Sequence, residues 1–294
     1  MKDLTLSIAQ MSPAFLDVRE NLGKILGFME KAVLDGSDLL LLPEMGLTGY
    51  GIGDNIKDPG ERSLLKGETR RALGGIRKAS RQLGLDVLAS YPFFSGERTF
   101  IAAEYIGSGK RTALHRKINL CNYAHYTEHL HYEEGNSPTV VTTEGGTFGI
   151  LICEDLWHAM NGIVETLLGA EILLVPSAPC VMDISGGESC LGRWHLITRS
   201  TAFLQTTYVV MGALAGTEGN NHFLGGSHVV SPEGEIMRQL PLFEEAVAQV
   251  RLEGGFLEEV RKKRPLLRNE RPPLYGKTLA GMVERLGETG RGRK

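Results

Sequence analysis

Short apolar runs alternate with amphipathic helical patterns along most of this chain, and this alternation limits the folds that it can adopt. Such runs are typical of buried strands, and apolar residues that recur every three or four positions are typical of the helices that cover them. We predict strands at 4–10, 38–42, 86–90, 101–106, 148–152, 171–175, 207–213 and 226–230, and helices at 17–35, 68–83, 159–169 and 193–206. This order predicts a layered α/β fold.

The length of 294 residues fits one large α/β domain, and the sequence shows neither a linker nor an internal repeat. We therefore expect residues 1–294 to form a single domain. From about residue 255 the sequence becomes basic and is interrupted by prolines, as in residues 261–265 (RKKRP). Such a segment is typical of a solvated arm.

Composition argues against several classes of partner. A formal net charge of −3 and a pI of about 6.3 give no reason to expect nucleic acid or an anionic membrane. No apolar stretch reaches the roughly 18–20 residues that span a bilayer. The first ten residues alternate like a strand rather than like a signal peptide. We therefore expect a cytoplasmic protein.

The cysteines and histidines bear on metal binding. None of the four cysteines belongs to a C-x-x-C pair, which argues against disulfides and a structural zinc site. We predict no metal, but a metal site stays open as an alternative. His125 and His129 have the spacing that places two side chains on one helix face. The residues that crowd this stretch are His115, Cys121, His125, His129 and His131.

Three predicted strands are followed by residues that can carry chemistry. Cys153 ends the apolar run 148–152, and a turn from strand to helix at this point exposes the sulfur beside free backbone N–H groups. Glu44 follows another apolar run, and Lys117 follows the predicted strand 101–106. A thiolate can attack a carbonyl, a carboxylate can move the proton, and a cation stabilises both the thiolate and the oxyanion.

These segments resemble the nitrilase, or carbon-nitrogen hydrolase, superfamily. The matching motifs are residues 42–44 (LPE), 116–120 (RKINL), 152–155 (ICED) and 223–234 (FLGGSHVVSPEG), and the resemblance runs from about Leu4 to Ala248. It implies a four-layer αββα sandwich and a catalytic triad of Glu44, Lys117 and Cys153. It also implies a homodimer or a larger homo-oligomer, with the tail from about residue 255 packed on a neighbouring subunit.

Within the superfamily, the residues around Cys153 and Lys117 look like the glutaminase domain of glutamine-dependent NAD synthetase. The resemblance implies that Glu128 is a fourth carboxylate, which orders Lys117 and the substrate amide. A lysine in a closed site also needs a counter-charge, which gives Glu128 independent support. By the same resemblance, Tyr50, Tyr123 and Glu154 belong to the pocket for the acyl group.

The sequence also departs from that glutaminase pattern. After the strand near 172–176 only Ser177 is retained as a candidate substrate-binding residue, and the expected basic residue is missing unless Arg193 replaces it. Leu204 and Gln205 stand where relatives carry Glu-Asn. Glutamine is therefore one candidate substrate among several amides.

One glycine-rich stretch resembles a motif from a different kind of domain. Residues 184–189 (ISGGES) look like the pyrophosphate loop of a synthetase domain, but too few residues follow for a domain that uses ATP. We interpret the stretch as a loop that lines the pocket.

The sequence thus predicts cofactor-independent hydrolysis of a small-molecule amide. Glu44 takes the proton of Cys153, and the thiolate attacks the carbonyl to give an oxyanion held by Lys117 and the Glu154 backbone N–H. Ammonia or an amine leaves, and water hydrolyses the thioester. Three alternatives stay open: an N-carbamoyl amidohydrolase, an acyltransferase of the same superfamily, and a non-catalytic homologue that binds a small amide.

Overall fold

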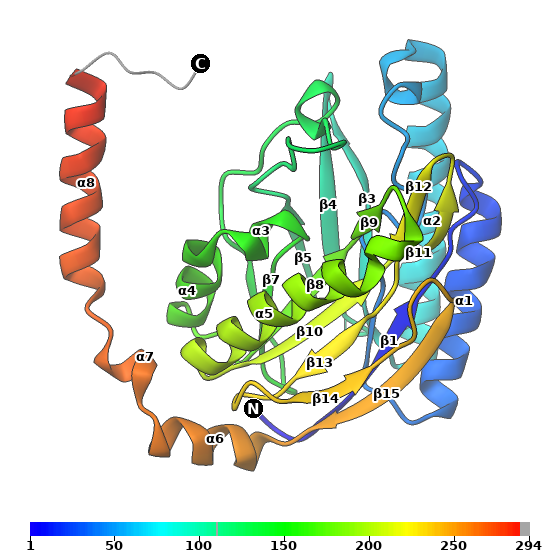
Figure 1. Ribbon diagram of the computed structural model, residues 1–294. Helices are drawn as coiled ribbons and strands as arrows, with labels where there is room; N and C mark the ends of the chain where they lie inside the picture. The colour runs from blue at the N-terminus through cyan, green and yellow to red at the C-terminus, as the bar shows by residue number, and fades with distance from the viewer. Residues whose placement is uncertain (110, 289–294) are drawn as a thin grey trace.

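Two six-stranded sheets form the centre of the molecule (Figure 1). The computed structural model describes residues 1–109 and 111–288. The first sheet contains, in spatial order, β15 (Ala246–Leu252), β1 (Leu4–Gln10), β2 (Leu39–Leu41), β3 (Asp86–Ser95), β4 (Arg98–Ile106) and β5 (Thr112–Arg116). The second contains β14 (Ile236–Gln239), β13 (His228–Val230), β10 (Tyr208–Ala213), β8 (Ile172–Ser177), β7 (Thr147–Ile150) and β6 (Val140–Thr142). A small third sheet consists of β11 (Ala215–Glu218), β12 (Asn221–Leu224) and β9 (Cys180–Val181).

Helices cover the outer face of each large sheet. α1 (Val18–Leu34) and α2 (Pro59–Leu83) pack on the first sheet, and α4 (Ala159–Leu167) and α5 (Gly187–Gln205) pack on the second. A single helical turn, α3 (Glu154–Trp157), follows β7. The predicted four-layer αββα sandwich is therefore confirmed. Three short 3₁₀ turns complete the body: η1 (Asn55–Lys57), η2 (Glu128–Leu130) and η3 (Ile184–Gly186).

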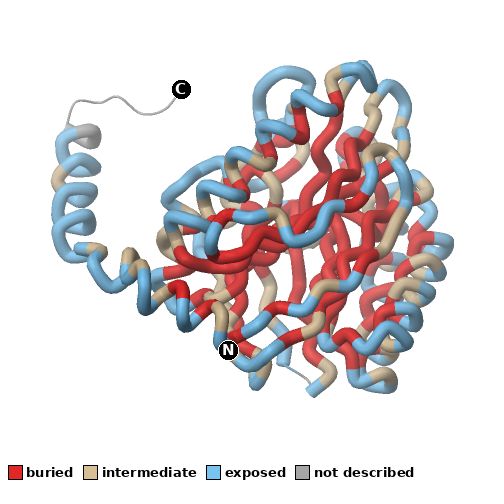
Figure 2. The backbone as a smooth tube through the Cα atoms, turned by 60° about the horizontal axis from the view of Figure 1, so that its bottom comes forward, coloured by how far each residue is buried: buried red, intermediate tan, exposed pale blue. Residues whose placement is uncertain are grey.

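The main core lies between the two sheets, and central strands such as β2, β8 and β10 are buried along their whole length (Figure 2). At Gly212 on β10 the sheets approach so closely that a Cβ atom would lie 3.0 Å from Leu41 Cγ of β2. Parallel strands that are covered on both sides carry continuous apolar runs, which is why β2 and β8 were visible in the sequence. The strands that the sequence did not predict are short or carry exposed polar residues: β5, β6, β9, β11, β12, β14 and β15.

Helix starts differ from the prediction where capping outweighs periodicity. α2 begins at Pro59 rather than residue 68, because the Asp58 side chain accepts a hydrogen bond from Glu61 N and proline suits the first helical position. α5 begins at Gly187 rather than residue 193. The prediction that residues 184–189 form a loop is therefore wrong. These residues form η3, capped by the Asp183 side chain, and the first turn of α5.

The C-terminal segment contains three helices, α6 (Gly254–Lys263), α7 (Leu266–Asn269) and α8 (Pro272–Glu288). α6 buries Leu257 and Val260 against its own chain, so the arm that leaves the body begins after α6 rather than at residue 255. α8 stands clear of the body in both views (Figures 1 and 2). Residues 289–294 of the predicted tail lie outside the described residues. In the described ranges, no helix has the length and apolar character needed to cross a membrane.

Candidate active site

Cys153 lies at a strained turn between β7 and α3. Its backbone has φ 48° and ψ −102°, a left-handed conformation that costs a non-glycine residue about 1–3 kcal/mol and is typical of functional sites. The Cys153 N–H donates to Pro176 O at 2.9 Å, which ties the turn to the end of β8. The side chain is half-buried. The predicted elbow is therefore present, with the thiol at the start of a helical turn.

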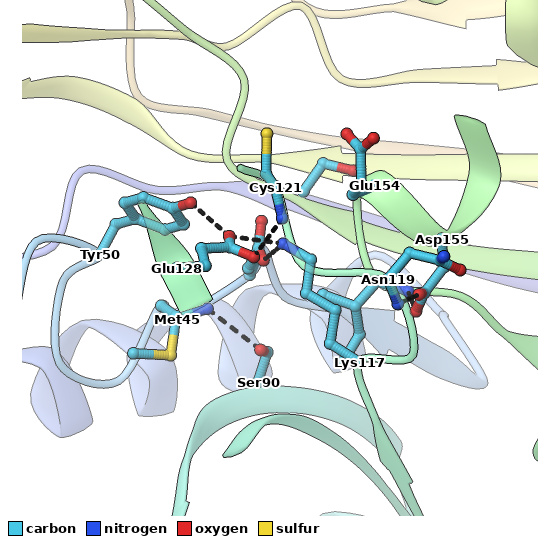
Figure 3. Close-up of polar contacts among 12 residues, drawn as sticks. Met45, Tyr50, Ser90, Lys117, Asn119, Cys121, Glu128, Glu154 and Asp155 are labelled. Atoms are coloured by element: carbon cyan, nitrogen blue, oxygen red, sulfur yellow. Dashed lines mark hydrogen bonds and ion pairs between the residues drawn. The ribbon is translucent and has the colours of Figure 1, made fainter. Parts of the chain in front are cut away.

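Glu44 reaches the same region from the end of β2 in the first sheet. Its side chain is fully buried, and the next residue, Met45, has a left-handed backbone with φ 54°. Met45 N donates to Ser90 Oγ at 3.1 Å, and this bond fixes the turn that carries Glu44 (Figure 3). Glu44 Oε1 accepts a hydrogen bond from Lys117 Nζ at 2.8 Å.

Lys117 is held between two buried carboxylates. It follows β5, a strand that the sequence did not predict, rather than the run 101–106, and its side chain is fully buried. Besides Glu44, Lys117 Nζ donates to Glu128 Oε1 at 2.7 Å. Glu128 also accepts bonds from the Tyr50 hydroxyl and, at 2.7 Å, from Cys121 N (Figure 3). The structure thus brings together the four residues predicted to be catalytic and places Tyr50 beside them.

Burial and charge alter the protonation of Glu44. Removal from water raises its pKa, the nearby Glu128 carboxylate raises it further, and the Lys117 cation opposes both, with the result that the pKa is about 7. The second carboxylate oxygen of Glu44, Oε2, has no hydrogen-bond partner within the described ranges. Glu44 therefore has the pKa of a group that can accept and return a proton near neutral pH.

The same environment raises the pKa values of both Lys117 and Cys153, which leaves the lysine charged and the thiol neutral. Burial disfavours the Lys117 ammonium, but the Glu128 and Glu44 carboxylates outweigh this effect and raise its pKa well above the usual value. Burial and the charge of Glu44 raise the pKa of Cys153, although Lys117 and the Ala178 backbone N–H oppose this. The resting state therefore contains a charged lysine and a neutral thiol. Attack by the sulfur requires a base.

We predict that turnover falls as the pH drops below about 7. Glu44 must be ionised to take the thiol proton, and with a pKa of about 7 it is protonated at lower pH. In that range kcat/KM should fall about tenfold per pH unit. A pH series of kcat/KM on the native protein and on Glu44→Gln tests this: the variant should lose the acidic inflection together with most of the activity. A flat native profile between pH 5.5 and pH 8.5 would contradict the assignment.

A cavity of about 170 Å³ opens above Cys153. Three of the predicted pocket residues, Tyr50, Tyr123 and Glu154, line it, and the Tyr123 hydroxyl donates to Glu154 Oε2 at 2.8 Å. Ser177 is not part of the lining. It is fully buried at the end of β8, where its hydroxyl donates to Val175 O at 3.3 Å. The prediction that Ser177 binds substrate therefore has no geometric support.

Several residues of the cavity wall were not predicted. Arg193, which the sequence offered only as a replacement for the missing basic residue, lines the cavity, is exposed to solvent and donates to Ser189 Oγ at 3.0 Å. His125 Nε2 and Cys180 Sγ lie 3.0 Å apart. No local sequence pattern joins these positions, because they come from different segments of the chain. The other unpredicted lining residues are Cys121, Ala124, Tyr126, Trp157, Pro179, Cys190 and Trp194.

The side chains of the histidine-rich stretch have partners other than one another. No group of three or more metal-ligating side chains converges in the described part of the chain. His115 is bound to Asp155 and Thr139, and His129 is bound to Asn122. The predicted helix face is absent as well, because only the 3₁₀ turn η2 forms in this stretch.

The substitutions at 204–205 lie away from the cavity. Leu204 is exposed near the end of α5, and the Gln205 side chain accepts a bond from Thr166 Oγ1 at 3.1 Å. The departure from the pattern of relatives thus affects the contact between α5 and α4 rather than the surroundings of Cys153.

The relatives of this chain include glutamine-dependent NAD(+) synthetases and an omega-amidase. It is 30% identical to the glutamine-dependent NAD(+) synthetase of Thermotoga maritima over 255 residues, which are 86% of this chain and 42% of that protein. It is 28% identical to the Aquifex aeolicus synthetase, covering 93% of this chain and 46% of that protein. The chain thus spans less than half the length of these two synthetases. The chloroplastic omega-amidase of Arabidopsis thaliana is 27% identical, covering 88% of this chain and 70% of that protein.

Solved structures and a family model agree on the fold. The NitN amidase of Nesterenkonia sp. AN1 matches with a TM-score of 0.78 at 23% identity, covering 93% of this chain and 99% of that one. The glutamine-dependent NAD+ synthetase of Acinetobacter baumannii matches with a TM-score of 0.78 at 21% identity, covering 87% and 47%. The family model for carbon-nitrogen hydrolases matches residues 5–262. On this match and on the fold, the chain belongs to the carbon-nitrogen hydrolase family.

Proposed function

We propose that this protein hydrolyses the C–N bond of a small-molecule amide through a thioester on Cys153. One observation carries the proposal. The Cys153 thiol stands at a strained strand-to-helix turn beside a buried carboxylate, Glu44, that is bonded to a buried cation, Lys117. This arrangement supplies a nucleophile, a base of matched pKa and a fixed positive charge.

In the first half of the reaction, Glu44 takes the Cys153 proton as the sulfur attacks the amide carbonyl carbon. The carbonyl π electrons move to oxygen, and Lys117 and the Glu154 backbone N–H stabilise the oxyanion. The Glu154 N–H has no other acceptor in the described ranges. When the intermediate collapses, the C–N bond breaks and the nitrogen leaves as ammonia or an amine with the proton from Glu44.

In the second half, water replaces the amine. Glu44 takes a proton from the water while the water oxygen attacks the thioester carbon. The C–S bond then breaks, the acid is released, and the proton on Glu44 returns to sulfur. Glu128 does not reach the reacting atoms in this scheme. It holds the Lys117 ammonium, and the Tyr50 hydroxyl and Cys121 N–H hold Glu128 in turn.

The relatives support an amide as the substrate class. An omega-amidase and glutamine-dependent synthetases are among them, and one related structure carries the acetamide moiety of fluoroacetamide on its active-site cysteine. The small cavity fits a metabolite rather than a peptide. Glutamine and other short amides that carry a carboxylate are favoured over neutral amides, because the exposed Arg193 provides a cation in the cavity wall.

The test is release of ammonia and of the matching acid from a panel of compounds. The panel contains glutamine, asparagine, short aliphatic amides, N-carbamoyl compounds and nitriles. The expected result is stoichiometric ammonia and acid from at least one amide, together with a mass increase on Cys153 when turnover is stopped by acid. Turnover that survives Cys153→Ala would refute the thioester mechanism.

The same panel of compounds distinguishes an amidase from a carbamoylase, an acyltransferase and a non-catalytic homologue. A carbamoylase would release carbon dioxide as well as ammonia, and an acyltransferase would form a new ester or amide only when a second nucleophile is present. A non-catalytic homologue would release no ammonia from any compound, and its Cys153 would fail to react with an alkylating agent.

We also propose a homodimer or larger homo-oligomer in which α8 packs on a neighbouring subunit. α8 leaves Tyr275, Leu279, Met282 and Val283 exposed on one face, although most helices depend on packing of an apolar face for stability. Deleting residues 270–294 should therefore lower the mass measured by light scattering toward that of the monomer. Lys277→Ala on the opposite face serves as the control and should leave the mass unchanged. An unchanged mass after the deletion would contradict the proposal.

A further inference from the structure

Asp155 has an unusual set of partners for a residue outside the proposed chemistry. It lies in α3, two residues after Cys153, and its side chain is fully buried. Asp155 Oδ1 accepts hydrogen bonds from Ile118 N at 2.9 Å and Asn119 N at 2.7 Å (Figure 3). Asp155 Oδ2 accepts one from Ile152 N at 2.9 Å and lies 3.0 Å from His115 Nε2. Both carboxylate oxygens therefore have two partners.

These partners belong to the two segments that carry the proposed reacting groups. Ile118 and Asn119 directly follow Lys117, whereas Ile152 directly precedes Cys153. β5, which leads to Lys117, is in the first sheet, and β7, which leads to Cys153, is in the second. No strand ladder in the described ranges pairs these two sheets. The distance between ammonium and thiol therefore depends on contacts such as those of Asp155.

His115 strengthens the same link. It lies on β5 two residues before Lys117, is fully buried, and bonds Asp155 through Nε2 and Thr139 Oγ1 through Nδ1, at 3.0 and 3.1 Å. A carboxylate partner favours a proton on Nε2, so the ring donates to Asp155 and accepts from the Thr139 hydroxyl.

Asn161 on α4 adds a parallel connection. Its Nδ2 donates to Asn119 Oδ1 and to the Asp155 backbone oxygen, each at 2.8 Å. The turn after Lys117 is thus bonded directly to the Asp155 side chain and, through Asn161, to the Asp155 backbone. Backbone N–H groups that bond a buried carboxylate form strong, charge-assisted bonds, which resist small displacements.

We propose that Asp155 is a positioning residue that holds the Lys117 ammonium and the Cys153 thiol in reacting geometry by bonding the ends of both sheets at once. The inference rests on the proposed function, because it assumes that Lys117 and Cys153 act together. Asp155 acts through geometry: the carboxylates that raise the pKa of Lys117 are those of Glu128 and Glu44, not that of Asp155.

The test compares Asp155→Asn with the native protein. The asparagine keeps the size but replaces one acceptor oxygen by an NH₂ group, which opposes the N–H donors. A displacement of about 1 Å in a reacting group can cost about 10²-fold in rate. We therefore expect kcat on the best amide of the panel to fall about 10²-fold, and iodoacetamide to label Cys153 at least about tenfold more slowly. KM should change less than about threefold, and the pH inflection near 7 should remain because Glu44 stays in place.

A matched control separates positioning from stability. Asp86 likewise joins separate segments. Its carboxylate accepts three bonds, from Ser108 N, Ser108 Oγ and the Tyr105 hydroxyl, but it connects β3 to the turn after β4, away from Cys153. Asp86→Asn should lower the melting temperature without changing kcat or the alkylation rate. If Asp155→Asn does no more than Asp86→Asn, the positioning role is overturned.

Two outcomes require a second measurement: a variant that does not fold, and a native protein that hydrolyses no amide. If Asp155→Asn does not fold, His115→Gln removes one of the four partners and should still lower kcat about tenfold; an unchanged kcat would overturn the proposal. If the native protein hydrolyses no amide, the proposed function fails, but the rate of Cys153 alkylation in the variants still decides whether Asp155 positions the thiol beside Lys117.

Discussion

Replacing Lys117 by methionine is expected to lower kcat for amide hydrolysis by at least about 10²–10³-fold and to lower the free energy of unfolding by about 3–5 kcal/mol. The Lys117 ammonium is the cation bonded to both Glu44 and Glu128, and all three side chains are buried. Without the cation, two carboxylates remain close together in a region of low dielectric. Loss of charge stabilisation at the oxyanion should remove about 10²–10³-fold in kcat, in addition to any loss caused by displacement of Glu44.

Urea unfolding and ammonia release on the same preparation measure both effects. The loss of stability should shrink as the pH drops, because Glu44, whose pKa rises further when the Lys117 cation is removed, can then take up a proton and relieve the repulsion. Lys31→Met is the control. Lys31 forms an exposed pair with Asp35, and such pairs contribute about 0–1 kcal/mol. Equal stability of Lys117→Met and Lys31→Met would contradict the buried ion-pair assignment.

Cys153→Ala should lower turnover by at least about 10⁴-fold while the fold is retained. When a nucleophile and its base act as a unit, removing the nucleophile alone typically lowers kcat about as much as removing all the catalytic residues together. The side chain is half-buried and packs at the edge of the core, so its truncation leaves a small space that opens to the cavity rather than a closed void. Circular dichroism and the urea midpoint should therefore stay close to those of the native protein.

Peptide mapping after fluoroacetamide treatment adds a second readout for Cys153→Ala. The cavity contains all four thiols of the chain, so loss of turnover alone does not say which sulfur reacts. Burial raises the pKa of Cys121 to about 12 and that of Cys180 to about 11. The native protein should carry a single adduct on Cys153, and the variant should carry none. An adduct on another cysteine with turnover retained would reassign the nucleophile.

The order of the elements was predictable because its signals are local. The first predicted strand, 4–10, matches β1, and the buried runs at 38–42 and 171–175 match β2 and β8 to within two residues at each end. Glu44 and Cys153 stood out because each interrupts an apolar run with a polar residue. Where the structure differs, another local signal was stronger: the Asp58 cap set the start of α2. β15 could not be predicted, because it pairs with β1 from the far end of the chain.

The residues of the candidate site were also predictable only where their signals are local. Strand ends in the sequence indicated Glu44, Lys117 and Cys153, and the family resemblance added Glu128. Lys117 was nevertheless assigned to the wrong strand, and Ser177, which the resemblance placed in the pocket, does not line it. The link between Asp155 and the turn after Lys117 left no local trace, because its partners are 36 and 37 residues away.

The sequence alone therefore determined the most buried strands, the four helices that cover the two large sheets and the residue types at the strand ends, because periodicity and capping act between near neighbours in the chain. Only the tertiary structure decided which charged groups share one buried space. The raised pKa values of Glu44, Lys117 and Cys153 follow from that placement, since desolvation and Coulomb energy depend on distances between segments that are remote in sequence.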